Sequence, residues 1–129
     1  MIINESVEDY LEAILMLKER KGMVRSIDVV RHLNYSKPSI SRAMSRLREN
    51  GYITMDAEGW LDLTEAGSAI AEQIYERHRI LSDWLTALGV TPEVARMDAC
   101  RLEHDISKET FACLRAHIEE TSPGVIWAL

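Results

Sequence analysis

Apolar side chains recur at intervals of three and four residues along most of this chain, the spacing that places them on one face of an α-helix. The pattern predicts six helices, at about residues 5–21, 27–33, 37–50, 65–88, 93–105 and 108–120. Gly22 is expected to end the first helix, and Ser26, Ser36 and Ser107 are expected to cap the second, third and sixth. The last eight residues, SPGVIWAL, lack this periodicity and are expected to form an irregular tail. The chain is therefore predicted to be mainly α-helical.

Two short apolar runs interrupt the helical pattern after the third helix. They cover residues 52–55 and 60–63, and the turn-forming sequence DAEG separates them. Turn residues between two such runs predict a β-hairpin. Helix, helix, turn, helix and hairpin, in that order, are typical of a winged helix-turn-helix. We therefore predict a winged helix-turn-helix domain at residues 1–64 and an all-helical domain at residues 65–129.

Charge is distributed unevenly along the 129 residues. The net charge of −6 on its own argues against a nucleic-acid partner. Residues 25–60, however, hold six basic and four acidic side chains, so this segment carries +2 and the remainder −8. A basic module on an acidic body lets one face approach phosphate. The distribution favours DNA binding by the first domain.

The sequence contains no apolar run near the roughly 18 residues that a membrane span requires. The N-terminal residues MIINESVEDY lack the basic and apolar regions of a secretory leader, so we expect a cytoplasmic protein without a membrane partner. Cys100 and Cys113 are too few for a disulfide framework and are expected to be thiols, with Cys113 a small buried apolar residue. His32 and His117 are expected at the surface.

The third predicted helix has an apolar stripe formed by Ile40, Ala43, Met44 and Leu47, as expected of a helix lying on a core. Its other positions are rich in serine and basic residues. Short hydroxyl side chains let a backbone approach the groove floor, arginine can pair with guanine, and either basic residue can contact phosphate. A merely solvated face is the alternative, although serine is a mediocre helix former. Asp56 and Glu58 should give the wing little affinity for phosphate. The candidate DNA-contacting residues are Ser36, Lys37, Ser39, Ser41, Arg42, Ser45 and Arg46.

Potential metal donors occur on three of the predicted helices. Cys100, Glu103 and His104 stand at i, i+3 and i+4, so their side chains leave one face of the fifth helix within a single turn. Taken singly, each donor has an ordinary interpretation, as a solvated carboxylate or an unremarkable histidine or cysteine. Together, donors from three helices can converge on one or two divalent ions. The candidate set is Asp9, Glu12, His78, Cys100, Glu103 and His104.

Five segments carry a family resemblance: EDYLEAI at 8–14, KPSISRAMSRL at 37–47, RHRIL at 77–81, LGV at 88–90 and DACRLEH at 98–104. In this order they resemble the DtxR/MntR family of iron- and manganese-dependent transcriptional repressors. The resemblance extends over about residues 5–120, nearly the whole chain. It implies a homodimer in which the helices after the hairpin form the dimerisation domain. It also implies a metal site where that domain meets the first helix.

By motif position, the resemblance places the family's metal ligands on the six donors named above. The manganese branch resembles this chain at Asp9 and Glu12 but has glutamate at position 100, whereas the iron branch has the cysteine but methionine at position 9. This sequence combines the two patterns. We expect Mn²⁺ or Fe²⁺, with Co²⁺ or Zn²⁺ also able to bind in vitro. The long iron-type members carry a C-terminal SH3-like domain, for which this chain is too short.

The expected function is that of a metal-dependent transcriptional repressor. It would bind double-stranded operator DNA as a homodimer when loaded with Mn²⁺ or Fe²⁺ and control metal homeostasis genes. Without metal, like charges at Asp9, Glu12 and Glu103 are expected to repel one another. An alternative is a winged-helix regulator that answers a small organic effector without metal. A metallohydrolase is a third interpretation, but no Gly-rich loop, nucleophile elbow or separate general base accompanies the donors, so we expect no enzyme.

Overall fold

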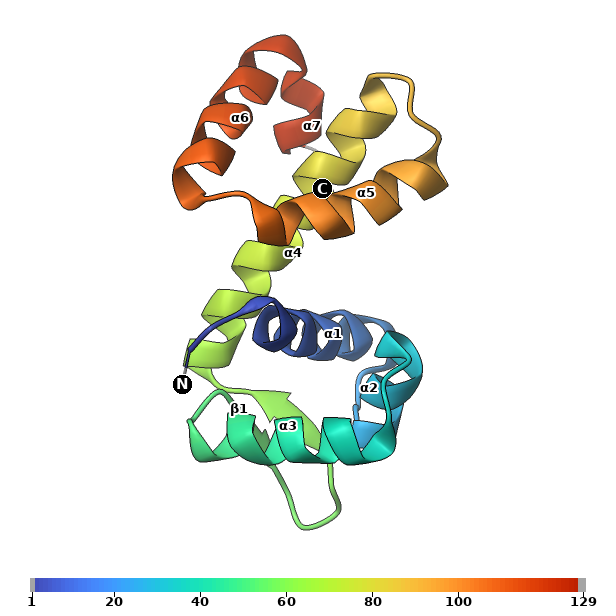
Figure 1. Cartoon of the computed structure of the whole chain (residues 1–129), viewed down its shortest axis with the longest axis vertical. Helices are drawn as coiled ribbons and strands as arrows, with labels where there is room; N and C mark the ends of the chain where they lie inside the picture. The colour runs from blue at the N-terminus through green and yellow to red at the C-terminus, as the bar shows by residue number, and fades with distance from the viewer. Residues whose placement is uncertain (1, 128–129) are drawn as a thin grey trace. The chain divides into compact units, whose positions relative to one another are not determined.

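The computed structural model describes residues 2–127. The chain divides into two compact units, Met1–Gln73 and Ile74–Leu129, and a long helix contributes to both. Helices dominate, with one small hairpin near the middle of the chain (Figure 1). The expected fold class, a mainly α-helical chain with a winged helix-turn-helix followed by helices, is confirmed. Each unit is described below by itself.

The first unit is a winged helix-turn-helix whose elements enclose one apolar core. Leu11, Ile14, Ile40, Met44 and Leu47 are completely buried and come from its first and third helices. The hairpin follows the third helix, and its turn projects away from the helices in Figure 1. The elements are α1 (Glu5–Lys21), α2 (Ser26–Leu33), α3 (Lys37–Glu49), β1 (Ile53–Met55), β2 (Leu61–Leu63) and the start of α4 (Glu65–Ala87).

Local capping interactions explain where the first helices begin and end. The Asn4 side chain accepts a hydrogen bond from the backbone N–H of Val7 at 3.1 Å and so caps α1. Gly22 ends that helix with φ 82°, a left-handed conformation in which glycine has no steric penalty. Ser36 caps α3 as the sequence predicts. In α2, by contrast, Ser26 is the first helical residue, and Arg25 takes the N-cap position.

The wing is a two-stranded antiparallel hairpin in which Ile53 pairs with Leu63 and Met55 with Leu61. The Asp56 carboxylate stabilises its turn by accepting backbone hydrogen bonds from Glu58 and Trp60, both at 2.9 Å. This acidic residue therefore has a structural role within the hairpin.

The N-terminus of α4 packs tightly against the chain that enters the wing. The Thr64 hydroxyl donates to the carbonyl of Gly51 at 2.6 Å and accepts from the N–H of Gly67 at 3.2 Å. A β-carbon at Gly67 would lie 2.0 Å from the carbonyl oxygen of Tyr52, well inside van der Waals contact. Only glycine fits this position without a shift of the backbone.

The second unit is entirely helical. It contains the remainder of α4 with α5 (Pro92–Asp105), α6 (Lys108–Thr121) and α7 (Pro123–Trp127). Its apolar core consists of Ile80, Ile118, Val125 and Ile126, with Trp84 and Phe111 packed against them. No helix of the described chain is long and apolar enough to cross a membrane.

Two sequence-based expectations about the second unit are wrong. The segment expected to be an irregular tail contains α7, because Val125 and Ile126 are buried and the Arg79 guanidinium donates to both of their carbonyls, at 2.8 and 3.2 Å. Residues 128–129 of that segment lie outside the described part. Cys113, expected to be buried, is exposed. It lies off the face of α6 that packs on the core through Phe111 and Ile118.

Candidate metal centre and nucleic-acid interface

Helix α3 buries one face and presents the opposite one to solvent. Ile40, Met44 and Leu47 have no exposed surface, which confirms the predicted stripe. Ser36 is the N-cap, and its hydroxyl donates to that of Ser39 at 2.8 Å. Of the other candidate DNA-contacting residues, Ser45 is half-buried, as is Ser39, while Lys37, Ser41, Arg42 and Arg46 are exposed. Their contact with DNA stays a prediction.

A hollow of about 350 Å³ lies between this helix and the start of α1. Arg42 and Arg46 line it on one side, and Asn4, Ser6 and Tyr10 line it on the other. The hollow thus combines two cationic groups with polar side chains, the chemistry that contacts a phosphate group. It extends the polar surface of α3 towards α1.

The wing holds a cationic side chain that sequence reasoning did not place there. The Arg25 guanidinium lies 3.9 Å from the ring centroid of Trp60, a cation–π contact. The indole N–H of Trp60 in turn donates to the Glu58 carboxylate at 3.2 Å. In the sequence, Arg25 is one of six basic residues in a segment of 36 and Trp60 is an apolar strand position, and no spacing rule connects residues so far apart.

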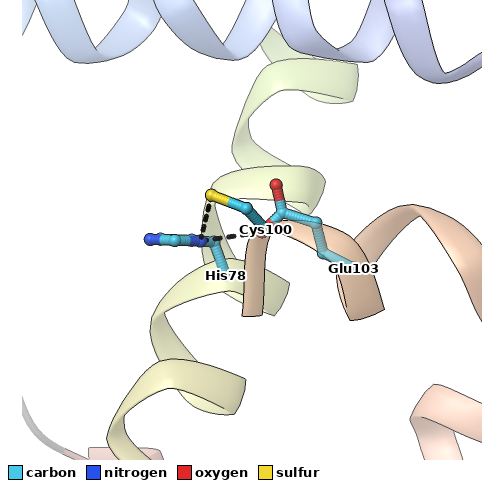
Figure 2. Close-up of side chains that lie close together, drawn as sticks. All are labelled: His78, Cys100 and Glu103. Carbon is cyan, nitrogen blue, oxygen red and sulfur yellow. Dashed lines mark hydrogen bonds and ion pairs between the residues drawn. The ribbon is translucent and has the colours of Figure 1, made fainter. Parts of the chain in front are cut away.

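The second unit brings three of the predicted metal donors into direct contact. The Nδ1 atom of His78 on α4 lies 2.9 Å from Oε2 of Glu103 and 3.7 Å from Sγ of Cys100, both on α5 (Figure 2). All three donor atoms lie within 4.8 Å of one another. Spacing along α5 places Cys100 and Glu103 on one face, and α4 supplies the histidine that faces them.

The fourth donor of this unit, His104, contacts the same carboxylate. Its Nε2 atom lies 3.3 Å from Oε1 of Glu103, so the two oxygens of Glu103 face different imidazoles. Glu103 is only 1% exposed, and within the described residues Oε1 accepts no hydrogen bond of normal geometry. A buried carboxylate needs cationic partners to remain ionised.

Electrostatic interactions within this cluster shift two pKa values. The hydrogen bonds from His78 to Cys100 and to Glu103 outweigh the effect of burial and raise the pKa of His78 to about 10. Burial works to raise the pKa of Glu103, but its contacts with His104 and His78 outweigh that effect and hold it below the usual range. Without metal, therefore, His78 is an imidazolium beside an ionised carboxylate.

The two remaining candidates, Asp9 and Glu12, lie one turn apart on α1 of the first unit. Their spacing places both carboxylates on one face of that helix. Their participation in a metal site with the second unit stays a prediction. His32 and His117, expected at the surface, are both exposed.

Both parts of the chain match described protein families. Residues 3–59 match the iron dependent repressor N-terminal DNA binding domain, and residues 64–122 match the iron dependent repressor metal binding and dimerisation domain. The helix-turn-helix and the first strand of the wing fall in the first match, and the second strand, Leu61–Leu63, lies between the two matches. The His78, Cys100 and Glu103 cluster falls in the second match.

Similar proteins that are described as transcriptional regulators support the same family assignment. The transcriptional regulator MntR of Escherichia coli O6:H1 is 37% identical over 111 residues, which make up 86% of this chain and 72% of that protein. The solved manganese regulator SloR is 26% identical, with a TM-score of 0.75 over 92% of this chain and 55% of its own. A manganese-dependent transcriptional repressor, solved in complex with manganese, is also 26% identical, with a TM-score of 0.76 over 89% of this chain and 51% of its own. The chain therefore spans about half the length of these two solved chains. It belongs to the DtxR/MntR family of iron-dependent repressors and is a metal-dependent transcriptional regulator.

Proposed function

We propose that this protein is a cytoplasmic repressor that binds operator DNA as a homodimer when loaded with Mn²⁺ or Fe²⁺ and controls metal homeostasis genes. The observation that carries the proposal is the cluster of His78, Cys100 and Glu103, which places three metal-donor atoms within 4.8 Å of one another. The cluster lies in the part of the chain that matches a metal binding and dimerisation domain.

The donor chemistry of the cluster fits a divalent transition metal. Imidazole, thiolate and carboxylate are ligands for such ions, and Glu103 is buried with one oxygen that lacks a normal hydrogen bond. The two oxygens of Glu103 contact different imidazoles, so the carboxylate presents one oxygen towards His78 and the other towards His104. Such an arrangement is compatible with one ion or with a bridged pair, and a metal-to-protomer ratio of one or two distinguishes them.

The choice between Mn²⁺ and Fe²⁺ depends on the balance of hard and soft donors. Asp9 and Glu12 would add hard oxygen ligands that suit Mn²⁺, while the Cys100 thiolate raises affinity for Fe²⁺, Co²⁺ and Zn²⁺. One solved relative is described as a manganese regulator and another as a manganese-dependent transcriptional repressor. We propose Mn²⁺ or Fe²⁺ as the physiological ion on the basis of the carboxylate-rich set.

DNA binding is assigned to the exposed face of α3. Its arginines can pair with guanine or contact phosphate, and its serines allow a close approach to the major groove. The hollow lined by Arg42 and Arg46 adds a place for a backbone phosphate beside this helix. Arg25, stacked on Trp60, supplies the wing with a positive charge that partly offsets Asp56 and Glu58.

Homodimerisation is assigned to the exposed apolar side chains of α5 and the turn that precedes it. Val94, Met97 and Leu102 are 47%, 55% and 37% exposed, and Leu88 is 64% exposed. Large apolar side chains gathered on one helix of a dimerisation domain are the composition of a subunit interface. We propose that a second copy of this chain covers these exposed side chains.

Metal dependence of DNA binding would arise from ligands on both units. Asp9 and Glu12 lie on α1, a helix of the DNA-binding unit, whereas the other four donors belong to the second unit. A shared ligand set would restrict the orientation of the two α3 helices in a dimer to match half-sites about one DNA turn apart. Metal and DNA would then promote each other's binding by about 1–3 kcal/mol.

The test is a DNA titration at fixed salt, with and without Mn²⁺ or Fe²⁺, on wild-type protein and Glu103→Gln. Wild type is expected to bind about 5- to 150-fold more tightly with metal, the range that corresponds to the coupling above. The variant is expected to lose that difference while keeping its metal-free affinity. Equal affinity of the wild type in both conditions contradicts the proposal and favours an organic effector instead.

A further inference from the structure

We infer that Arg77 is a positioning residue for the metal-donor cluster, an assignment that rests on the proposed metal site. Arg77 directly precedes His78 on α4 and is half-buried. Its Nη1 atom donates to the backbone carbonyl of Glu103 at 3.2 Å and to that of Ile106 at 3.3 Å. Two consecutive residues of α4 therefore contact Glu103. Arg77 binds the backbone carbonyl of Glu103, and His78 binds the carboxylate of Glu103.

These bonds form where α5 ends without a left-handed cap. Ile106 follows the helix in an extended conformation, with φ −106° and ψ 149°. The last carbonyls of a helix have no partner within the helix and must be satisfied from outside it. The Arg77 guanidinium satisfies two of them and also lies 5.1 Å from the ring centroid of Phe111 on α6. Arg77 thus joins α4, α5 and α6 at the end of α5 that carries Glu103.

The position of α5 relative to α4 determines whether the donors converge. His78 is on one helix and Cys100 and Glu103 are on the other, so a small shift of α5 changes the His78 to Glu103 and His78 to Cys100 distances together. Metal sites tolerate little such displacement, and loss of an outer-shell partner weakens metal binding by about 10- to 100-fold.

Arg79 offers a closely matched control on the same helix. It also donates to two backbone carbonyls, those of Val125 and Ile126, but it joins α4 to α7 and not to the donor-bearing α5. Arg77→Met and Arg79→Met each remove one charge and two such hydrogen bonds. Only the first is expected to displace the donors.

Simple electrostatics predicts the opposite sign for Arg77→Met. A cation beside a metal site repels the metal, so its removal alone should strengthen binding. A positioning role predicts weaker binding. The sign of the change therefore distinguishes the two effects.

The experiment measures Mn²⁺ and Co²⁺ affinity by chelator competition, and the thiolate-to-Co²⁺ absorption band, for wild type and four variants. Arg77→Met is expected to bind about 10- to 100-fold more weakly with a weakened thiolate band, and Arg79→Met within about threefold of wild type. Arg77→Lys keeps the positive charge on a single nitrogen and serves as the second variant if Arg77→Met does not fold. It is expected to lose a smaller but measurable part of the affinity. Three outcomes would overturn the inference. The first is unchanged or tighter metal binding by folded Arg77→Met, and the second is equal losses for Arg77→Met and Arg79→Met. If Arg77→Met does not fold, the third is unchanged binding by Arg77→Lys. If Glu103→Gln also keeps full affinity, the proposed metal site itself is wrong.

Discussion

The raised pKa of His78 predicts a steep dependence of metal affinity on pH. A metal ion binds the neutral imidazole, so the proton on His78 must leave first. With a pKa of about 10, the neutral fraction of His78 increases about tenfold for each unit by which the pH rises, as long as the pH stays below that value. Between pH 6.5 and 8.5 the affinity should therefore increase at least about 100-fold, whereas an unperturbed imidazole would allow only about a twofold increase.

Two measurements test this prediction. Nitrogen-15 NMR of the imidazole rings in metal-free protein reports the pKa of His78 directly, with His78→Gln identifying its signal. Competition with a chelator at fixed ionic strength then gives the Mn²⁺ affinity at each pH, and calorimetry in buffers of different ionisation enthalpy counts the protons released. An affinity that changes by only about twofold from pH 6.5 to 8.5 would refute the reasoning from the His78 contacts.

Stability of the metal-free protein should follow the opposite trend. Because the folded-state pKa of His78 lies above the unfolded value, its contribution is fully present below pH 6.5 and is lost as pH rises towards about 10. Glu103 behaves in the reverse sense, since its lowered pKa gives a contribution that is lost only as pH falls below its ordinary value. Urea unfolding of chelator-treated protein should therefore show declining stability from pH 6.5 to 10, with a smaller decline in His78→Gln.

Four further predictions concern metal choice, DNA, the interface and packing. Cys100→Glu should shift the ratio of Mn²⁺ to Zn²⁺ affinity towards Mn²⁺ by about tenfold or more, and an unchanged ratio would show that Cys100 is not a ligand. Arg42→Ala should reduce the slope of log affinity for DNA against log salt by about 0.9, the effect of one lost phosphate contact, and an unchanged slope would place Arg42 away from the backbone. Met97→Asp should raise the dimer dissociation constant about 30-fold or more in sedimentation, while a dimer of normal affinity would exclude this face. Gly67→Ala should cost about 2–3 kcal/mol in urea unfolding because its β-carbon meets Tyr52, whereas Gly124→Ala meets nothing within 4 Å and should be neutral.

Helix positions were predictable because apolar spacing and capping residues are local features. Gly22 ends α1 and Ser36 caps α3 where the sequence places them, through bonds to residues at most four positions away. Helix α7 was missed because five residues are too short to show a period. Its order comes from burial and from Arg79, 46 and 47 residues earlier in the chain.

Part of the candidate site was predictable for the same reason. Cys100 and Glu103 share a helix face by spacing alone, but contact with His78 depends on how α4 packs against α5. The role of Arg77 could not be found from sequence, since its bonds go to backbone carbonyls that any residue type provides. Spacing gave the six scattered donors as a candidate set, and the family resemblance added the reason to treat them as ligands of one metal site.

In the metal-free protein, the charge around Glu103 differs from what a count of acidic residues suggests. Counting places three like charges at Asp9, Glu12 and Glu103, which should repel. Within the second unit, however, Glu103 is paired with the His78 imidazolium at 2.9 Å and contacts His104. A protonated histidine thus neutralises Glu103, and metal binding at the proposed site would exchange this proton for a metal ion. Repulsion from Glu103 is therefore largely removed within the second unit before metal binds. Under the proposed function, we expect the dependence of DNA binding on metal to require the two donors on α1, Asp9 and Glu12. Asp9→Asn with Glu12→Gln should then abolish the effect of metal on DNA affinity while leaving a metal-binding cluster in the second unit, measurable as Co²⁺ binding. Loss of both properties in that double variant would show that the second unit alone cannot hold the metal.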